Sequence, residues 1–530
     1  MPTTRPAVFS ERGAVATPHY LASVAALDVL QEGGNAVDAA VAAASTLGVV
    51  LPHMTGIGGD AFWLVYDAGS RTLAALDGSG TAGREVSCAR YPDESAIPQR
   101  GPRAAITVPG AVRSWGDAHR RFGSLPFERL LQAAIFYAEN GCPVSDHLAA
   151  WSETDREVLA RDSGAASIFL TENRARVVGE RMRQPALAQS LRAIARTGDK
   201  AFYGPIARTI VSYLRAQGGF LSEEDFDAYR TRWVAPISTT YRGYTAYQVP
   251  PPSQGLAGLM ILNALKRLDL RALGDGSVDY YRAMIQAVSW AFKYRDAELC
   301  DPQFGSIPLQ RLLDPLLADE IDSRTGQREP AEQQTRPTGE DTVFLTTADA
   351  AGNAVGLVQS LYFDFGSCVA DPDSGVLLQN RGSFFSLRPD HPNALEPGKR
   401  TASTLMAAML FQDDRPYLVY GTQGGEGQPQ TQTSIVTRVV DFGLGVQAAI
   451  EAPRFLHGPA WGAASPALLL EAPAGREVAA GLDSLEFPVE VTPPLSPRLG
   501  TAQAIRLKAE GRAFFESGAD PRGDGLALGY

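Results

Sequence analysis

Two hydroxyl residues that a hairpin would bring together have the clearest catalytic chemistry in this sequence. Thr342 opens a segment typical of a β-hairpin, with strands expected over 343–349 and 354–361. Folding that hairpin about its central turn brings Ser360 opposite Thr342. A polar run over 322–338 precedes the hairpin. A hydroxyl at the first residue of a strand, preceded by such a run and facing a second hydroxyl, suggests an N-terminal nucleophile.

The chemistry of this hypothesis requires a cut in the chain. A threonine hydroxyl is a weak nucleophile until a base accepts its proton. If the bond between Asp341 and Thr342 is cut, the new α-amino group lies beside the hydroxyl of the same residue. A free α-amine has a pKa of about 7.7–8.0, so it can accept that proton near neutral pH. The alternative interpretation is that Thr342 simply begins a strand.

Other short stretches offer groups that could complete a site. Arg381 follows a short strand expected over 376–378 and could bind a carboxylate, although a structural ion pair is an equally good interpretation. Gly424 and Gly425 lie between an expected strand and an expected helix, where two backbone N–H groups could stabilise an oxyanion.

Further polar residues could orient a substrate. Ser403 and Thr404 form a hydroxyl pair, and Asn380 precedes Arg381. Ser79 lies in a turn of small polar residues that could contact a ligand or be an ordinary glycine turn. The glycines at 58–59 precede a strand and lack a Gly-Lys-Ser/Thr sequence, so nucleotide binding is disfavoured.

Composition excludes several classes of protein. The chain has 530 residues and a net charge of −11, which argues against nucleic acid as the main partner. The four cysteines show no Cys-x-x-Cys spacing, and the six histidines form no His-x-x-x-His pair. We therefore expect no metal site and no cofactor.

The chain shows no targeting or membrane segment. Its N-terminus lacks an apolar signal-type region, and no run of 18 apolar residues occurs. We expect a cytoplasmic protein without a membrane partner.

The hydrophobic pattern predicts helices and strands in mixed order. Strands are expected over 13–17, 61–66, 72–76, 241–249 and 417–420, and helices over 19–32, 36–49, 127–140, 184–197, 256–268, 278–297 and from about 431. Most of 108–330 is expected to be helical, and Ser222 with Asp225 resembles a capping box. The best candidate for a boundary is the stretch 322–341.

Taken together, these motifs resemble the γ-glutamyltransferase family of N-terminal-nucleophile hydrolases. The matching pieces span nearly the whole chain in the family's order: Gly33-Gly-Asn-Ala-Val-Asp-Ala-Ala-Val-Ala, Gly56-Ile-Gly-Gly-Asp, Asp341-Thr342, Gly352-Asn-Ala-Val, Gly375-Val-Leu-Leu-Gln-Asn, Lys399-Arg400, Ser403-Thr404 and Gly424-Gly425. The runs 379–387 and 421–432 are similar to a signal-less branch that includes oxamate amidohydrolase and γ-glutamyltransferase-like proteins.

The resemblance implies a fold and a set of roles. The fold is of the α/β (α+β) class, a four-layer αββα sandwich made as one precursor. Self-cleavage gives a large chain, 1–341, and a small chain, 342–530, which stay together as one unit. Thr342 would be the nucleophile, and Ser360 the hydroxyl that assists it. Gly424 and Gly425 would form the oxyanion hole, and Ser403 and Thr404 would line the glutamyl pocket.

Two departures from the family affect the expected substrate. The family's arginine for the glutamyl α-carboxylate falls on Ser79, and its aspartate pair, which includes the partner of the α-amine, falls near Ser383 and Phe384. A serine and a phenylalanine cannot pair with a zwitterion, whose buried charges need partners. Arg381 could still hold a carboxylate.

We therefore expect a self-processing amidohydrolase that forms an acyl-enzyme on Thr342. Its substrate would be a small carboxylate-bearing amide, either oxamate-like or γ-glutamyl, with water as the acceptor. Two alternatives stay open. One is genuine γ-glutamyl transfer with glutathione hydrolysis, and the other is an uncleaved homologue that only binds. A homodimer is also left open.

Overall fold

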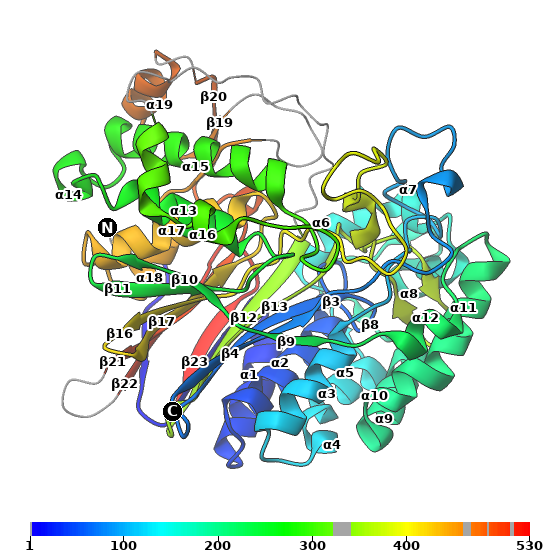
Figure 1. Cartoon of the computed structure of the whole chain (residues 1–530). Coiled ribbons are helices and arrows are strands. Elements are labelled where there is room, and N and C mark those ends of the chain that lie inside the picture. The colour runs from blue at the N-terminus through cyan, green and yellow to red at the C-terminus, as the bar shows by residue number, and fades with distance from the viewer. Residues whose placement is uncertain (1–2, 322–340, 459–467, 485–486, 509–513) are drawn as a thin grey trace.

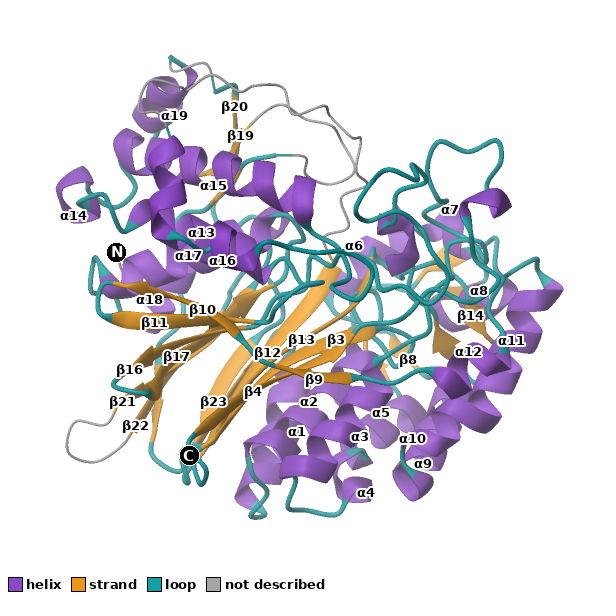
Figure 2. Cartoon of the chain, viewed as in Figure 1, coloured by secondary structure: helices purple, strands orange, loops and turns teal. Residues whose placement is uncertain are grey.

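The computed structural model describes residues 3–321, 341–458, 468–484, 487–508 and 514–530. Among these residues, two seven-stranded sheets lie face to face, and helices cover the outer face of each sheet (Figures 1 and 2). This arrangement confirms the expected four-layer αββα sandwich.

The first sheet contains the hairpin that opens with the candidate nucleophile. Its neighbouring strands are antiparallel throughout. In spatial order they are β23 (Leu526–Gly529), β2 (Gly13–Thr17), β12 (Asp341–Asp349), β13 (Ala354–Tyr362), β3 (Asp60–Asp67), β4 (Thr72–Gly78) and β9 (Arg232–Val234).

The second sheet contains the strand that leads into the glycine pair. Its neighbours are also antiparallel. In spatial order they are β1 (Val8–Ser10), β22 (Phe514–Ala519), β21 (Ala502–Lys508), β17 (Arg415–Thr422), β16 (Ala408–Gln412), β11 (Tyr244–Gln248) and β10 (Ile237–Tyr241).

Helices form the two outer layers. The first sheet is covered by α1 (Tyr20–Gln31), α2 (Ala36–Val50), α3 (Ala111–Phe122), α5 (Gln132–Asn140) and α9 (Pro185–Thr197) (Figure 1). The second sheet is covered by α13 (Gly255–Leu265), α15 (Val278–Glu298), α17 (Gly427–Val440) and α18 (Val446–Glu451). Every residue of α2 is buried, as its run of alanine and valine indicates.

A separate apolar layer fills the space between the two sheets. Phe62 of β3, Phe344 of β12 and Val358 of β13 pack there against Met409 and Val419 of the second sheet. Since side chains alternate along a strand, the residues two positions before Phe62 and Phe344, and two positions after Val358 in the antiparallel strand β13, also face the inter-sheet space. By that rule the side chains of Asp60, Thr342 and Ser360, each near the end of its strand, lie together at one end of this layer.

The hairpin of β12 and β13 has the predicted register. β12 ends at Asp349 and β13 begins at Ala354, which confirms the turn between them. Asp341 pairs with Tyr362 and Val343 with Gln359, so Ser360 and Leu361 stand opposite Thr342. Two residues opposite one make a β-bulge, which sharpens the local twist where the proposed cut falls.

Several boundaries differ from the sequence-based prediction. The strand expected over 241–249 begins only at Tyr244, because Arg242 and Gly243 adopt positive φ angles of 51° and 85° in the two-residue turn between β10 and β11. The helix expected over 127–140 is broken at Leu131. Helix α17 begins at Gly427, four residues before the expected start.

Other local predictions hold. Ser222 caps α12 (Glu223–Ala228) in a capping box with Asp225, and Asn35 does the same for α2 with Asp38. The polar run at 322–338, and with it most of the predicted boundary, lies outside the described residues.

Candidate active site

The hydroxyl of Thr342 donates a hydrogen bond to that of Ser360 across the hairpin. The two oxygens are 3.1 Å apart, and both side chains are buried. Ser360 Oγ also accepts from the backbone N–H of Tyr362, at 2.8 Å. The pairing predicted from the hairpin register therefore exists in the fold. Strand β12 runs through both Asp341 and Thr342, so the structure is that of the uncut chain, in which Thr342 nitrogen is still a peptide nitrogen.

The backbone beside this pair is strained. Tyr362 pairs with Asp341 and has a φ of 89°, a conformation that side chains other than glycine rarely adopt. Such strain tends to occur at functional sites, where the surrounding structure holds it in place. Here it falls directly opposite the residue before the proposed cut.

Arg381 lies against the hydroxyl pair. It is the first residue of a short 3-10 helix, Arg381–Phe384, and its guanidinium contacts Thr404 Oγ1 at 3.1 Å and Ser360 Oγ at 3.5 Å. The guanidinium carbon also lies 4.1 Å from the centre of the Tyr362 ring. Arg381 is thus placed within two contacts of the candidate nucleophile.

This guanidinium is buried without a described counter-ion in contact. Arg381 is 1% exposed, and among the described residues its Nε has no hydrogen-bond partner and no carboxylate lies within ion-pair distance. Burial lowers its pKa to about 10, against the opposing charge effects of Tyr362 and Asp60. Among the described side chains, the alternative role as a structural ion pair therefore finds no carboxylate to support it.

The glycine pair offers two unused backbone donors. Gly424 and Gly425 follow β17 and adopt positive φ angles of 111° and 46°. Within the described part of the chain, neither N–H group donates a hydrogen bond. Successive N–H groups left free by such a turn form an anion-binding nest, which suits an oxyanion hole.

Side chains connect this loop to the hydroxyl pair. Gln254 Nε2 donates to the carbonyl oxygens of Gly425, at 2.9 Å, and Thr404, at 2.7 Å. Thr404 in turn accepts from Arg381, which contacts Ser360. Gly421 and Phe344 are in contact across the sheets, so the end of β17 lies over the start of β12. The glycine loop and Thr342 therefore belong to one site.

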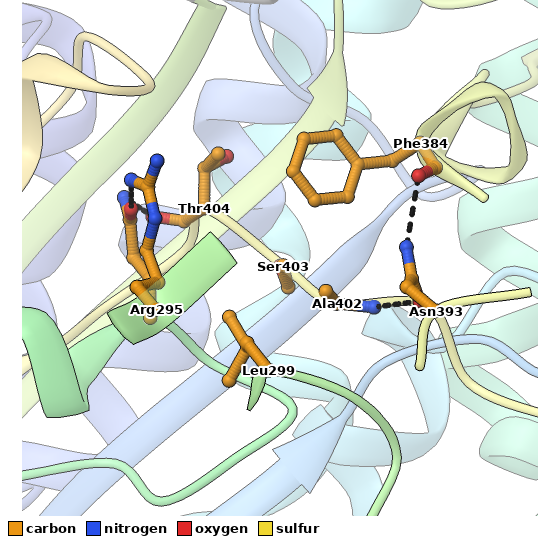
Figure 3. A pocket seen from close by; sticks show the side chains of 8 residues that line it. Arg295, Leu299, Phe384, Asn393, Ala402, Ser403 and Thr404 are labelled. Atoms are coloured by element: carbon orange, nitrogen blue, oxygen red, sulfur yellow. Dashed lines mark hydrogen bonds between the residues drawn. The ribbon is translucent and has the colours of Figure 1, made fainter. Parts of the chain in front are cut away.

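A small cavity opens beside Thr404 (Figure 3). Its lining residues come from α13 and α15 of the second sheet's helical layer, from the short 3-10 helix and from the loop before β16: Gln254, Arg295, Leu299, Phe384, Asn393, Ala402, Ser403 and Thr404. The Phe384 ring projects toward Ser403 and Thr404, and Arg295 forms a buried ion pair with Glu426 of the glycine loop. Thr342 itself does not line this cavity.

The remaining predicted residues have other contacts. Asn380 holds two backbone segments, since it accepts from Phe363 N–H at 3.1 Å and donates to the Gln99 carbonyl at 2.7 Å. The Ser79 hydroxyl donates to Asp77. A direct role of either in substrate binding therefore stays a prediction.

The positions of the family's aspartate pair carry no charge. Ser383 donates to the Asn380 carbonyl oxygen, and Phe384 presents its ring to the cavity. Neither side chain offers a negative charge, as the sequence predicts.

Sequence reasoning missed two buried polar residues at this site, Asp60 and Gln379. Asp60 begins β3 and pairs with Ser360, and its Oδ1 accepts from Gln379 Nε2 at 2.8 Å and from Gly80 N–H at 2.9 Å. The signal was the acidic residue that ends Gly56-Ile-Gly-Gly-Asp. A carboxylate at the first residue of an otherwise apolar strand is an unusual place for a charge.

The described residues contain neither a candidate metal-binding cluster nor a candidate membrane-spanning helix. No cluster of three or more His, Cys, Asp or Glu side chains gathers there in a way that could hold a metal ion. None of the helices described combines the length and apolar character needed to cross a membrane.

Comparison with known proteins places this geometry in a family. The family described as Gamma-glutamyltranspeptidase matches residues 22–530. The chain belongs to that family. Its membership makes it an enzyme of the N-terminal-nucleophile hydrolase type, as its sequence motifs suggested.

Curated relatives from this family are similar over their whole length. The chain is 46% identical to the Glutathione hydrolase-like YwrD proenzyme of Bacillus subtilis, over 98% of this chain and 99% of that protein. It is 39% identical to the Oxamate amidohydrolase proenzyme of Klebsiella pneumoniae, again over 98% and 99%.

A solved structure has the same architecture. The cephalosporin acylase from Bacillus halodurans superposes with a TM-score of 0.91 at 34% identity, covering all of this chain and 98% of that one. The names of these family members cover several acyl groups, so the substrate must be argued from the site itself.

Proposed function

We propose that this enzyme cuts itself before Thr342 and then hydrolyses small amides whose acyl part carries a carboxylate close to the carbonyl. The observation that carries the proposal is Arg381, a buried cation with no described carboxylate in contact, two contacts away from the Thr342 hydroxyl. A buried charge without a partner is costly, and an anionic substrate would supply the partner.

Self-cleavage would use the residues of the uncut chain. Thr342 Oγ1 attacks the Asp341 carbonyl carbon while its proton passes through the Ser360 hydroxyl to the departing Thr342 nitrogen, and the acyl group shifts from nitrogen to oxygen. Water then hydrolyses the ester, which frees the Asp341 carboxyl and the Thr342 α-amine. The bulge and the strained Tyr362 opposite Asp341 favour departure of this peptide from planarity.

Amide hydrolysis would follow the same geometry. The freed α-amine accepts the Thr342 hydroxyl proton as Oγ1 attacks the substrate carbonyl. The N–H groups of Gly424 and Gly425 donate to the oxyanion, an effect that mutagenesis elsewhere puts at about 2.7–4 kcal/mol per donor. The protonated α-amine then gives its proton to the leaving nitrogen, and water resolves the acyl-enzyme.

Arg381 favours a short acyl group. Contacts of 3.1 and 3.5 Å join the Thr342 hydroxyl to the guanidinium through Ser360, so the two groups are no farther apart than these lengths laid end to end. A carboxylate bonded directly to the reacting carbonyl, as in oxamate, fits this separation. In a γ-glutamyl group three carbon atoms intervene, and the family's usual charged partners are replaced by Ser79, Ser383 and Phe384.

Two alternatives remain beside this proposal. The family name and the glutathione hydrolase relatives favour γ-glutamyl transfer or hydrolysis. An uncleaved protein that only binds a ligand is the other.

Comparing two substrates tests the proposal. The purified enzyme should release ammonia from oxamate with a kcat/KM about 100-fold above that for γ-glutamyl anilide, because only the short acyl group completes the Arg381 ion pair. Arg381→Met should lower kcat/KM for oxamate by about 100-fold, with Arg381→Lys intermediate because one ammonium cannot reproduce both contacts. Efficient γ-glutamyl turnover that Arg381→Met leaves unchanged would contradict the proposal.

A further inference from the structure

The Asp60 carboxyl lies on the same side of the sheet as the reacting hydroxyls. Asp60 is the cross-strand partner of Ser360, and residues directly opposite each other in an antiparallel pair project to the same face. That face is the inter-sheet one, because Phe62, two residues further along β3, packs in the inter-sheet core. From strand to strand, Thr342, Ser360 and Asp60 therefore form a row at the end of the sandwich.

Two acceptor atoms at this place have no described donor. Oδ1 of Asp60 accepts from Gln379 Nε2 and Gly80 N–H, but its Oδ2 has no hydrogen-bond partner in the described part of the chain. The Oε1 atom of Gln379 also has none, and each of the two side chains is 1% exposed. Leaving a buried acceptor unpaired costs free energy. Asp60 and Gln379 are hydrogen-bonded to each other and each has one unpaired oxygen, so a hydrogen-bond donor from outside the chain would satisfy both.

A cation lies near this carboxyl without pairing with it. Burial raises the pKa of Asp60, and the charge of Arg381 opposes that rise, so the two groups influence each other electrostatically. Yet no ion pair joins them, and Arg381 Nε is also unpartnered among the described atoms. Two opposite charges that are buried near each other without forming an ion pair lose much of the attraction that would offset their desolvation. A ligand that contacts both would restore it.

We propose that Asp60 and Gln379 form an N–H acceptor subsite that binds the nitrogen end of the substrate whose carboxylate pairs with Arg381. This inference rests on the proposed amidohydrolase function and narrows its substrate class. The substrate carries a carboxylate and an N–H donor within a few bonds of each other. The donor is either the amide nitrogen that leaves or an amino group on the acyl part.

The subsite would also separate substrate from product. Hydrolysis of oxamate replaces its amide NH₂ with an oxygen and releases ammonia, so that the amide becomes a second carboxylate and the product is oxalate. The donor that Asp60 accepts from thus becomes an anion that Asp60 repels, since like charges in a buried site are strongly unfavourable. Asp60 therefore favours binding of the amide over the diacid and promotes release of the product.

Asp60→Asn tests the subsite because the change is nearly isosteric. An asparagine Oδ1 can still accept from Gly80 and Gln379, while its NH₂ replaces the unpaired oxygen. In the mature enzyme we expect oxalate binding, measured by calorimetry, to tighten at least 10-fold. We expect the KM for oxamate to rise at least 10-fold. Competition by L-asparagine identifies the donor. If Asp60→Asn changes the competition by asparagine but not the KM for oxamate, the donor is an amino group on the acyl part.

Asp77→Asn is the matched control. Asp77 is another buried carboxyl in the neighbouring strand β4, but its oxygens are occupied by Ser79 and by Arg400, the latter at 3.4 Å. Its variant should leave the preference between oxalate and oxamate within twofold of the wild type.

Oxalate binding needs no turnover, so the inference and the proposed function fail separately. An enzyme that cuts itself but does not hydrolyse oxamate contradicts the function. Oxalate that binds wild type and Asp60→Asn equally, or binds neither, overturns the subsite. The subsite is also overturned if Asp77→Asn shifts the preference between oxalate and oxamate as much as Asp60→Asn does.

Discussion

At the scale of single residues, the site keeps charges that destabilise the fold. Burial raises the pKa of Asp60 to about 6, with hydrogen bonds from Gly80 and Gln379 and the Arg381 charge opposing the rise. An unfolded aspartate has a pKa of about 3.9, so the ionised carboxyl costs about 3 kcal/mol of stability at neutral pH. A binding role explains why such a group is present.

The sign of this effect gives a stability prediction. Because the folded pKa lies above the unfolded one, the cost is complete above pH 6 and disappears as the pH falls below about 4. Asp60→Asn should therefore raise the melting temperature by about 3 °C at pH 7.5 and leave it unchanged near pH 4. Scanning calorimetry at the two pH values measures the difference. An equal loss of stability at both would mean that the carboxyl holds the fold together.

The site residues that could be predicted from the sequence are those whose contacts depend only on the register of one hairpin. Thr342 and Ser360 belong to one hairpin, so counting from its turn sufficed to pair them. Asp60 and Ser360 are 300 positions apart, and their pairing depends on β3 lying beside β13. The strand neighbours of β13 cannot be deduced from its own pattern, which is why Asp60 and Gln379 were missed.

At the scale of elements, the glycine loop owes its shape to a second loop packed against it. Gln423 N–H donates to the Thr501 carbonyl at 2.9 Å, and Thr501 Oγ1 donates to Gln423 Oε1 at 3.0 Å. A Cβ on Gly500 would meet the Gln423 carbonyl oxygen at 2.7 Å, so only glycine permits this approach. The loop at 499–502 therefore sets the position of Gly424 and Gly425.

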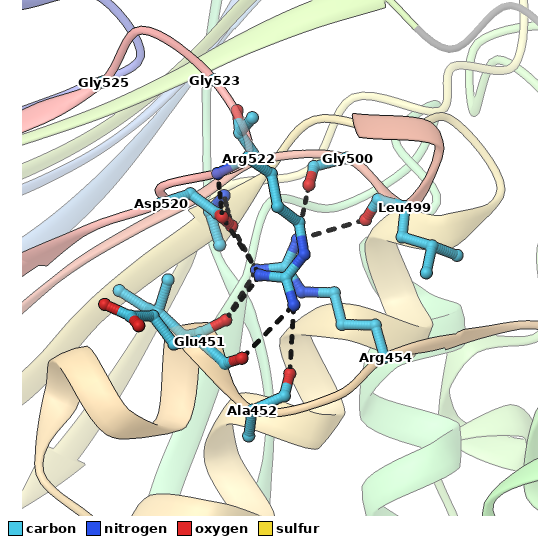
Figure 4. A network of polar contacts seen from close by, with 12 residues as sticks. Glu451, Ala452, Arg454, Leu499, Gly500, Asp520, Arg522, Gly523 and Gly525 are labelled. Carbon is cyan, nitrogen blue, oxygen red and sulfur yellow. Dashed lines mark hydrogen bonds and ion pairs between the residues drawn. The ribbon is translucent and has the colours of Figure 1, made fainter. Parts of the chain in front are cut away.

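A buried network of charges fixes that second loop (Figure 4). Arg454 donates to the carbonyl oxygens of Leu499, at 3.1 Å, and Gly500, at 2.6 Å, and pairs with Asp520. Asp520 also accepts from Ala502 N–H at 2.8 Å. Arg522 belongs to the same network and also pairs with Asp520, but its other contacts are with Glu471 and the carbonyls at 450–452 rather than with the carbonyls of Leu499 and Gly500.

Replacing Arg454 and Arg522 one at a time separates an effect on the position of the oxyanion donors from an effect on the stability of the fold. Arg454→Gln should lower kcat about 10-fold or more with KM within twofold, because displaced oxyanion donors act mainly on the transition state. Arg522→Gln removes a similarly buried charge and should lower the melting temperature while kcat stays within twofold. Steady-state kinetics well below both melting temperatures make the comparison. Equal losses of kcat in the two variants would show that Arg454 is only structural.

Sequence reasoning located the strand, the glycines and the helix of this segment but misjudged their limits. The sequence predicts a helix from about Thr431, whereas α17 begins at Gly427. In the structure Pro429 lies in the first turn of α17, where its missing N–H is not needed. The supporting network joins residues 454, 499–502 and 520, and no local pattern links them.

At the scale of the whole molecule, the proposed cut would not release its products. In the first sheet β12 and β13, which follow the cut, lie between β2 and β3, which precede it. In the second sheet β10, β11 and β1 precede the cut and flank four strands that follow it. Separating the pieces would break both sheets and expose all three apolar layers. The two chains should therefore elute together and part only in denaturant.

The intact mass of the purified protein, recorded under native and denaturing conditions, tests the central claim most directly. The account predicts one species in native buffer and two in denaturant, with masses of residues 1–341 and 342–530. Thr342→Ala should give a single chain of 530 residues in both. A wild-type protein that stays one uncut chain yet hydrolyses amides would contradict the account, because the α-amine that should deprotonate Thr342 would still be a peptide nitrogen.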